Sequence, residues 1–247
     1  MLLSTLTHIH ASVIPVLASD GTVFMDSRAH KTIWDGCVAA RAHGTTVVPT
    51  PTTTPRPWGR LLHRHSKAPR LVCVDGVNSM TGNPPRLPEF LALARANDAL
   101  VYVDDAHGFG AIGEHSRSDT RARPRWHHWP ACSPGSRSTR PGGRPAGHLL
   151  GQDPADPRHL EKLGAFTLNR SGFPIVEVPL GDADDFAKAS RFLLEQGSYV
   201  TLAFYPGVPR EEVGFRIQVT AANTDDEVSE LLVALDRLAD VVPLRPI

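Results

Sequence analysis

Short apolar runs alternate with longer stretches in which apolar and polar residues are mixed, over most of the chain. Fully apolar runs are typical of strands buried on both faces of a parallel sheet, and apolar residues at helical spacing are typical of amphipathic helices. In the first half of the chain, strands are predicted at 22–25, 45–48, 71–74 and 100–103. Helices are predicted at 30–43 and 87–96, while 12–18 fits either a buried helix or a strand.

Glycine and proline set the limits of these elements. Gly44 is expected to end the helix at 30–43, and Pro88 fits the first turn of the helix at 87–96, where a missing N–H costs nothing. The stretch 49–58 contains four prolines and is predicted to be loop or extended chain.

The last third of the chain has a denser pattern. Strands are predicted at 174–180, 199–204 and 215–220, and helices at 183–196 and 224–238. Thr224 and Glu227 form a T-x-x-E capping box at the start of the last helix. These elements predict a small α+β domain at 166–247, after a large α/β domain with a mostly parallel sheet at 1–165.

Residues 115–150 interrupt the large domain. Between 115 and 147 the chain is rich in Arg and Pro and contains no Leu, Ile, Val or Phe. Such a composition cannot form a packed core, so this segment is expected to be disordered.

Charge and cysteine content exclude several classes of protein. The chain has 247 residues, with 26 basic and 26 acidic side chains, so no overall field favours nucleic acid or anionic membranes. No apolar run is long enough to span a bilayer, and the N-terminus lacks the basic start of a secretory signal. Three scattered cysteines, two of them in apolar segments, indicate buried thiols in a reducing compartment. We expect a cytoplasmic protein without a membrane span.

Polar residues that could carry chemistry follow the predicted strand at 100–103. Asp104 and His107 lie in the sequence D-D-A-H-G, at the carboxyl end of that strand. In open α/β sheets, ligands bind at this edge. The alternative is that both residues only cap the next element.

Together with three other stretches, this motif resembles the α-oxoamine synthase group of pyridoxal-phosphate (PLP) enzymes in the aminotransferase class I/II superfamily. The resemblance covers 1–115 and about 168–247. It implies a fold-type-I PLP-dependent transferase, with a truncated large domain and a small C-terminal α+β domain. It also implies a homodimer that condenses an amino acid with an acyl-CoA, and no nucleic-acid partner.

The resemblance assigns roles to the motif residues. Asp104 matches the carboxylate that faces the PLP ring nitrogen and keeps it protonated. His107 matches a histidine near the cofactor's phenolic oxygen. His30, in D-S-R-A-H-K-T-I-W-D-G, matches the histidine that stacks on the ring, although a histidine that opens a helix is more often an ordinary surface residue.

Two further positions match less completely. Ser79, in D-G-V-N-S-M-T-G-N, matches a serine that bonds near the phenolic oxygen, but it could equally satisfy its own loop. Thr81 and Asn83 replace the two aspartates of the family's loop, which puts the acyl substrate in doubt. Arg216, in G-F-R-I-Q-V-T-A, matches the arginine that clamps the substrate carboxylate, and the alternative is a solvated strand arginine.

The phosphate site has only a weak counterpart. Thr5, Leu6 and Thr7 fall where the family has the turn S-G-x-x-x-N, whose backbone N–H groups bind phosphate at a helix start. The glycine and the asparagine of that turn are absent here.

The Schiff-base lysine of the family has no counterpart. The chain has four lysines, Lys31, Lys67, Lys162 and Lys188, and none lies in a matching motif. The expected position falls within 135–143, which contains arginines, and a guanidinium does not lose its proton near neutral pH. We therefore expect impaired or absent turnover, and we hypothesise that 115–150 is an out-of-frame stretch.

Two other interpretations remain open. The first is a catalytically dead remnant that binds cofactor weakly or acts as an interaction partner. The second is a nucleic-acid or zinc-binding module centred on 117–144, where arginine and tryptophan could bind single strands and His127, His128 and Cys132 could ligate zinc.

Overall fold

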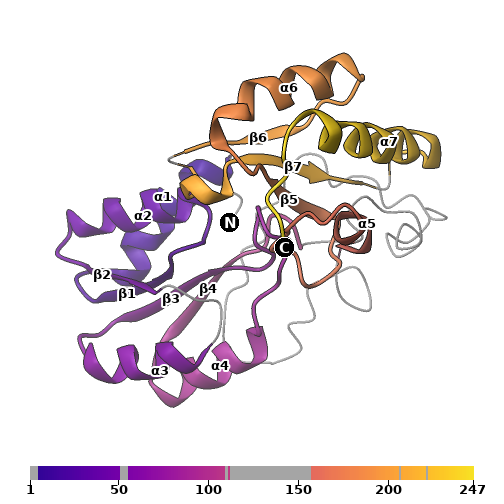
Figure 1. Cartoon of the computed structure of the whole chain (residues 1–247). Helices are drawn as coiled ribbons and strands as arrows, with labels where there is room; N and C mark the ends of the chain where they lie inside the picture. Colours follow the sequence, from indigo (N-terminus) through magenta and orange to yellow (C-terminus); the bar gives the residue numbers. More distant parts are fainter. Residues whose placement is uncertain (1–4, 51–54, 109–110, 112–156, 206, 221) are drawn as a thin grey trace. The chain divides into compact units, whose positions relative to one another are not determined.

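The computed structural model describes residues 5–50, 55–108, 111, 157–205, 207–220 and 222–247 (Figure 1). The described residues form two compact units. The first comprises 5–50, 55–79, 84–108 and 111, and the second comprises 80–83 with the described part of 157–247. The second unit thus includes α5 (Pro157–Lys162), which we had placed before the predicted boundary at 165. Three predictions concern residues outside this described part: the disorder of 115–150, the expected lysine position, and a zinc or nucleic-acid module.

The first unit is built on a four-stranded parallel sheet with the strand order β2-β1-β3-β4. This confirms the predicted α/β class and the mostly parallel sheet. In chain order, the elements are α1 (Leu6–Ala18), β1 (Thr22–Asp26), α2 (Lys31–Arg41), β2 (Thr46–Thr50), α3 (Pro55–Arg64), β3 (Arg70–Asp75), α4 (Leu87–Ala96) and β4 (Leu100–Asp104).

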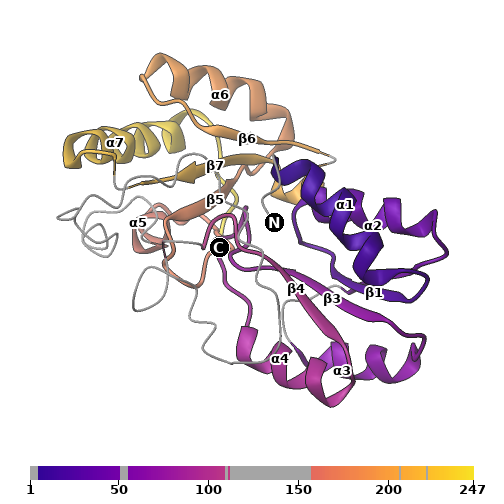
Figure 2. The ribbon, with the colours of Figure 1, turned by 180° about the vertical axis from the view of Figure 1, so that it is seen from behind.

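Helices cover both faces of this sheet, as Figures 1 and 2 show from opposite sides. Successive strand residues point to opposite faces, so each strand feeds two cores. Val23 and Leu71 pack with Ile14 of α1 and Ile33 of α2. On the other face, the core contains Phe24, Val72, Trp58, Leu62 and Phe90, from two strands and from α3 and α4. The two-sided burial explains why the central strands read as continuous apolar runs.

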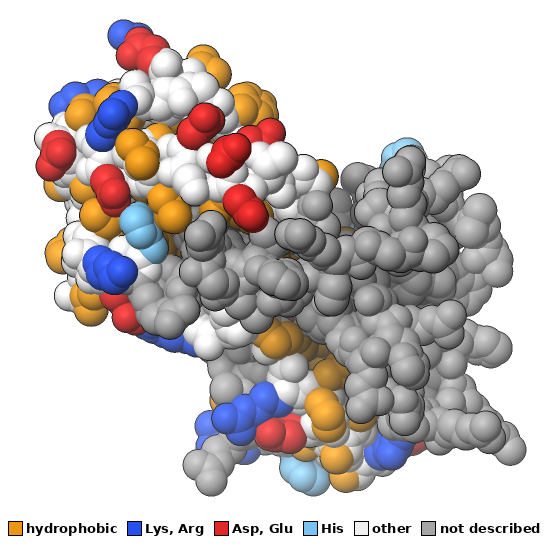
Figure 3. Space-filling model, turned by 90° about the vertical axis from the view of Figure 1, so that its right-hand side faces the viewer, with side chains coloured by type: hydrophobic (Ala, Val, Ile, Leu, Met, Phe, Trp, Pro, Cys, Tyr) orange, Lys and Arg blue, Asp and Glu red, His pale blue; other side chains and the backbone are white. Residues whose placement is uncertain are grey.

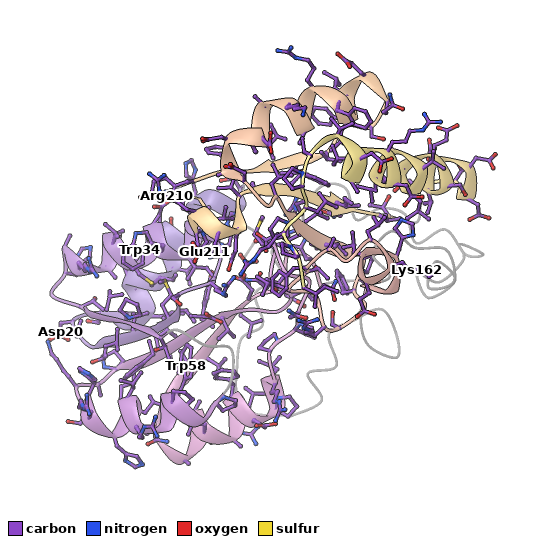
Figure 4. All side chains as sticks on the ribbon, viewed as in Figure 1. Asp20, Trp34, Trp58, Lys162, Arg210 and Glu211 are labelled. Carbon is purple, nitrogen blue, oxygen red and sulfur yellow. The ribbon has the colours of Figure 1, made fainter. Side chains whose placement is uncertain are left out.

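The helix α3 corrects one prediction. We expected 49–58 to be loop or extended, but the helix begins at Pro55, and β2 extends to Thr50. Prolines are tolerated in the first turn of a helix because their missing N–H has no intrahelical partner there. Trp58 (Figure 4) is fully buried in the core. Its ring packs edge-on against that of Phe90, with the two ring centroids 5.1 Å apart.

The second unit pairs an antiparallel sheet with helices. Its strand order is β5-β7-β6, and Leu235 and Leu193 are buried in its core. The capping box between Thr224 and Glu227 is confirmed. In chain order after α5, the elements are β5 (Ile175–Pro179), η2 (Ala183–Asp185), α6 (Phe186–Glu195), β6 (Thr201–Ala203), η3 (Arg210–Glu212), β7 (Gly214–Gln218) and α7 (Asp225–Val241).

The short segment 80–83 belongs to this second unit through hydrogen bonds. The Asn83 side-chain amide donates to the Leu168 carbonyl oxygen at 2.8 Å, and its Oδ1 accepts from the Arg170 backbone N–H at 2.8 Å. The Ser171 hydroxyl donates to the carbonyl oxygen of Gly82 at 2.8 Å. An aspartate at position 83 could not donate to Leu168, so this departure from the family loop has a structural reason.

The described surface carries both signs of charge, as the equal numbers of acidic and basic residues predict. Acidic and basic side chains are interspersed over the described surface in the view of Figure 3. Among the described residues, no helix is both long enough and apolar enough to cross a membrane. Cys37 and Cys73 are buried free thiols, as predicted for the cysteines in apolar segments.

Candidate functional site

Three aspartates end three strands of the first unit at the same edge of the sheet. Asp26, Asp75 and Asp104 are the last residues of β1, β3 and β4, and all three are buried. Asp75 and Asp104 are direct neighbours in the parallel register. The predicted placement of Asp104 at the carboxyl edge is thus what the structure has. Sequence reasoning did not single out the other two carboxylates.

Both oxygens of Asp104 lie against a nitrogen of the protein. Oδ1 accepts from the backbone N–H of Ala106 at 3.1 Å, and Oδ2 lies 3.1 Å from Nε2 of His10. Burial by itself would raise the pKa of Asp104. The hydrogen bond from His10 and the charge on its ring outweigh that effect and leave the pKa below its ordinary value. Asp104 is therefore a buried carboxylate that stays ionised at neutral pH.

His10 is a site residue that the sequence motifs did not single out. It lies on the face of α1 that also carries Ile14 and Ala18, and its side chain is 1% exposed. Its Nδ1 lies 2.8 Å from the hydroxyl oxygen of Tyr102. The spacing 10, 14, 18 places a histidine at a core position of a helix, which is a signal we did not use because the predicted element began at residue 12.

Asp75 fixes the loop that follows β1. Its Oδ1 accepts from the backbone N–H of His30 at 3.1 Å. The Asn78 amide donates both to Asp75 Oδ2 at 3.2 Å and to the Arg28 carbonyl oxygen at 2.7 Å. Burial, with the charges of Asp104 and Asp26 as smaller contributions, raises the pKa of Asp75 to about 8. Asp75 and Asn78 thus set the position of His30 through its backbone.

His30 is the N-cap of α2, in agreement with its predicted place at a helix start. Its Nδ1 accepts from the backbone N–H of Thr32 at 3.3 Å and lies 2.7 Å from the Thr32 hydroxyl oxygen. The side chain is exposed. An exposed imidazole at the carboxyl edge of β1 is compatible with stacking on a ring, although capping accounts for one of its nitrogens.

His107 and Ser79 lie in the loops that follow β4 and β3. His107 is half-buried three residues after Asp104, and Ser79 is buried four residues after Asp75. Since β3 and β4 are parallel neighbours, both loops leave the sheet at one edge. The structure therefore brings four of the predicted residues to that edge: Asp104, His107, His30 and Ser79.

The predicted phosphate turn is the start of α1. Thr5 is its N-cap, and the Thr5 hydroxyl accepts from the His8 backbone N–H at 3.3 Å. Leu6 and Thr7 form its first turn. His10, near the start of α1, contacts Asp104 at the carboxyl end of β4, while Ser19, after the end of α1, accepts a hydrogen bond from Thr45, just before β2. The N-terminus of α1 therefore lies toward the carboxyl edge of the sheet. Backbone N–H groups at a helix start can bind an anion.

Arg216 lies in the other unit. It is a half-buried residue of β7, and it is directly opposite the buried Glu177 of β5 in the antiparallel register. Burial lowers the pKa of Arg216. Its guanidinium also donates to Gln218 Oε1 at 3.4 Å. It is therefore not a solvated strand arginine, and the proposed clamp would have to act beside a buried carboxylate of its own sheet.

All four lysines of the chain fall within the described residues. Lys31 Nζ bonds to both carboxylate oxygens of Asp35, at 2.7 and 2.8 Å, and Lys67 pairs with Asp20 at 3.1 Å, near the amino end of β1. Lys188 donates to the Val241 carbonyl oxygen at 2.7 Å. Lys162 is exposed in the last turn of α5 (Figure 4). In the first unit only Lys31 is close to the carboxyl edge, and its ammonium is paired.

Comparisons with known proteins agree with this geometry. Residues 10–130 match the family model for aminotransferase class I and II. The 8-amino-7-oxononanoate synthase of Azoarcus sp. (strain BH72) is 29% identical over 282 residues, which cover 93% of this chain and 70% of that protein. The chain is related to the α-oxoamine synthases of the aminotransferase class I and II family. The resemblance noted from its motifs is thereby confirmed.

Other relatives support the same relationship. The 8-amino-7-oxononanoate synthase of Geobacter metallireducens is 42% identical over 110 residues, 44% of this chain and 27% of that protein. Among solved structures, serine palmitoyltransferase from Sphingomonas wittichii has a TM-score of 0.81 at 23% identity, covering 98% of this chain and 73% of that one. At this identity, the structural likeness shows the fold, and it confirms the predicted fold type.

Proposed function

We propose that the chain binds pyridoxal 5′-phosphate at the carboxyl edge of the four-stranded sheet, with Asp104 facing the ring nitrogen. The observation that supports this most is the buried carboxylate of Asp104, which His10 and the Ala106 N–H keep ionised. A buried anion at the ligand-binding edge of a parallel sheet is suited to pair with a protonated pyridine nitrogen.

The residues at this edge fit the other parts of the cofactor. PLP, when bound, supplies an electron sink for negative charge at the carbon next to a substrate's amino nitrogen. Asp104 would hold the ring-nitrogen proton, and His30 would lie against the ring face. His107 and Ser79 would lie near the phenolic oxygen. The start of α1, at Thr5, Leu6 and Thr7, would bind the phosphate through backbone N–H groups.

The relatives suggest a more specific activity. Those named above are 8-amino-7-oxononanoate synthases and a serine palmitoyltransferase. We propose by analogy that the chain derives from an acyl-CoA:amino acid C-acyltransferase, in which Arg216 would bind the substrate carboxylate. A homodimer and a cytoplasmic location remain predictions from the resemblance and the composition.

The lysines favour binding without efficient turnover. A lysine can form a Schiff base only if its amine reaches the cofactor. The Lys31 ammonium instead bonds to both carboxylate oxygens of Asp35, one turn further along α2. We therefore expect PLP to be bound without a covalent bond to the protein. This observation also supports the second candidate function, that of a catalytically inactive binding or interaction protein.

Borohydride reduction with peptide mapping tests this expectation. The purified chain is saturated with PLP, reduced, digested and analysed by mass spectrometry, with the Lys31→Ala variant as a matched control. We expect PLP to bind while no lysine carries a stoichiometric reduced adduct. A stoichiometric adduct on one lysine would show that this lysine replaces the family's and would restore the transferase assignment. Failure to bind PLP at all would refute the proposed cofactor.

A further inference from the structure

Two further buried side chains stand in line with Asp104. The Tyr102 hydroxyl lies 2.8 Å from His10 Nδ1, a hydrogen bond, and His10 Nε2 lies 3.1 Å from Asp104 Oδ2, an ion-pair contact. The His10 side chain is 1% exposed and that of Asp104 is 7% exposed. Nothing in the proposed cofactor contacts requires this buried histidine, so it needs a reason of its own.

The fold holds His10 rigidly in this place. On the same face of α1, Ile14 and Ala18 are fully buried against α2 and the sheet. Gly36 of α2 lets the two helices approach closely, because a Cβ at that position would lie 2.5 Å from the His10 carbonyl oxygen. Neither helix can move without opening this contact. His10 is thus presented to Asp104 by a closely packed pair of helices.

We propose that His10 is a positioning residue that orients the Asp104 carboxylate toward the cofactor's ring nitrogen. This inference rests on the proposed function. The Tyr102 hydroxyl faces Nδ1 and the Asp104 carboxylate faces Nε2, so both ring nitrogens of His10 have a polar neighbour. Since burial raises the pKa of Tyr102, its hydroxyl stays protonated.

This arrangement has a defined consequence for Asp104. The Ala106 backbone N–H donates to one carboxylate oxygen and His10 Nε2 lies against the other, so rotation of the carboxylate about its side-chain bond would disrupt both contacts. The Asp104 carboxylate keeps its negative charge, which is available for a protonated ring nitrogen. His10 thereby governs how well the site recognises that nitrogen and has no direct role in contacting the rest of the ring.

The test compares PLP with an analogue in which C–H replaces the ring nitrogen. Dissociation constants for both are measured by equilibrium dialysis on the wild-type chain and on His10→Leu, His10→Gln, Tyr102→Phe and His8→Ala. A hydrogen bond to a charged group corresponds to a preference for PLP of about 10- to 100-fold in the wild type. His10→Leu is expected to lower this preference to about threefold or less. The glutamine variant, which keeps a donor at the end of the side chain, should retain most of it.

The remaining variants act as controls for folding and for the relay. His8→Ala, an exposed change on the same helix, should leave the preference unchanged. Tyr102→Phe should give an intermediate preference, and it serves in place of His10→Leu if that variant does not fold. Equal preference in the wild type and in His10→Leu would overturn the positioning role while leaving the PLP site intact. A wild type that binds both ligands equally would instead overturn the contact between Asp104 and the ring nitrogen, and with it the proposed function.

Discussion

Raising the pH from about 5 to about 8 is expected to lower the unfolding free energy of the first unit by about 4 kcal/mol through Asp75 alone. Its pKa in the folded chain is about 8, against about 3.9 for an unperturbed aspartate. Between these values, the folded chain holds a proton that the unfolded chain has lost. The contribution of Asp75 to stability is therefore full only below about pH 3.9, declines as the pH rises through this window, and is lost above the folded pKa.

A comparison of two variants isolates this effect from the titration of histidines. Asp75→Asn keeps an oxygen that can accept from the His30 backbone N–H, and it should remove most of the decline. Asp20→Asn alters an exposed carboxylate whose pKa is lowered by its hydrogen bond with Lys67, so its effect belongs below pH 4. Urea unfolding followed by tryptophan fluorescence, repeated at several pH values, gives the unfolding free energy against pH for the wild type and the two variants. Parallel pH profiles for the wild type and Asp75→Asn would show that Asp75 is ionised throughout.

Asn169→Ala is expected to destabilise the second unit by about 3 kcal/mol. The Asn169 side chain is fully buried, and it makes four short hydrogen bonds with the backbone. Its amide nitrogen donates to the carbonyl oxygens of Phe173 and Ile175, both at 2.7 Å. Its Oδ1 accepts from the N–H groups of Ser171 and Gly172 at 2.9 and 3.0 Å. Alanine removes all four bonds from this partly buried turn, and among the described residues the Phe173 carbonyl oxygen then keeps only the Ile175 backbone N–H as a donor, at 2.7 Å.

The loss would also reach the segment that follows Ser79. Ser171, which Asn169 orders, donates to Gly82. Asn223→Ala is the matched control, because Asn223 bonds only to Thr220 in an exposed turn and should cost about 1 kcal/mol or less. Urea unfolding monitored by circular dichroism measures both. Similar losses for the two variants would mean that water replaces the Asn169 contacts.

Much of the fold follows from the sequence because the two central strands are apolar on both faces. Leu71 and Val72 are buried in the cores on opposite faces of the sheet. The apolar run that contains them is therefore readily predicted to be a buried strand. The start of α3 did not follow, since a proline-rich stretch reads as loop unless the first turn of a helix is considered. The burial of Trp58 depends on tertiary packing, and no local pattern predicts it.

Site residues that belong to a local sequence motif could be predicted, whereas those brought to the site by packing between distant segments could not. Asp104 was predicted from its place after an apolar strand, which is a local feature. The contact between His10 and Asp104 joins residues that are distant in the sequence, and it depends on the order of the strands and on the close approach of α1 and α2. Asp75 was passed over for a similar reason, because its raised pKa arises from burial and from carboxylates on neighbouring strands.

The most direct test of the account is the affinity of PLP for the wild-type chain and for Asp104→Asn. Asp98→Asn is the control, since Asp98 precedes β4 at the opposite edge of the same sheet and has a backbone φ of 48° that asparagine tolerates. We predict that PLP binds to the wild type and to Asp98→Asn alike, and about 10- to 100-fold more weakly to Asp104→Asn. Equal affinity in all three proteins would contradict the assignment of this edge as the cofactor site.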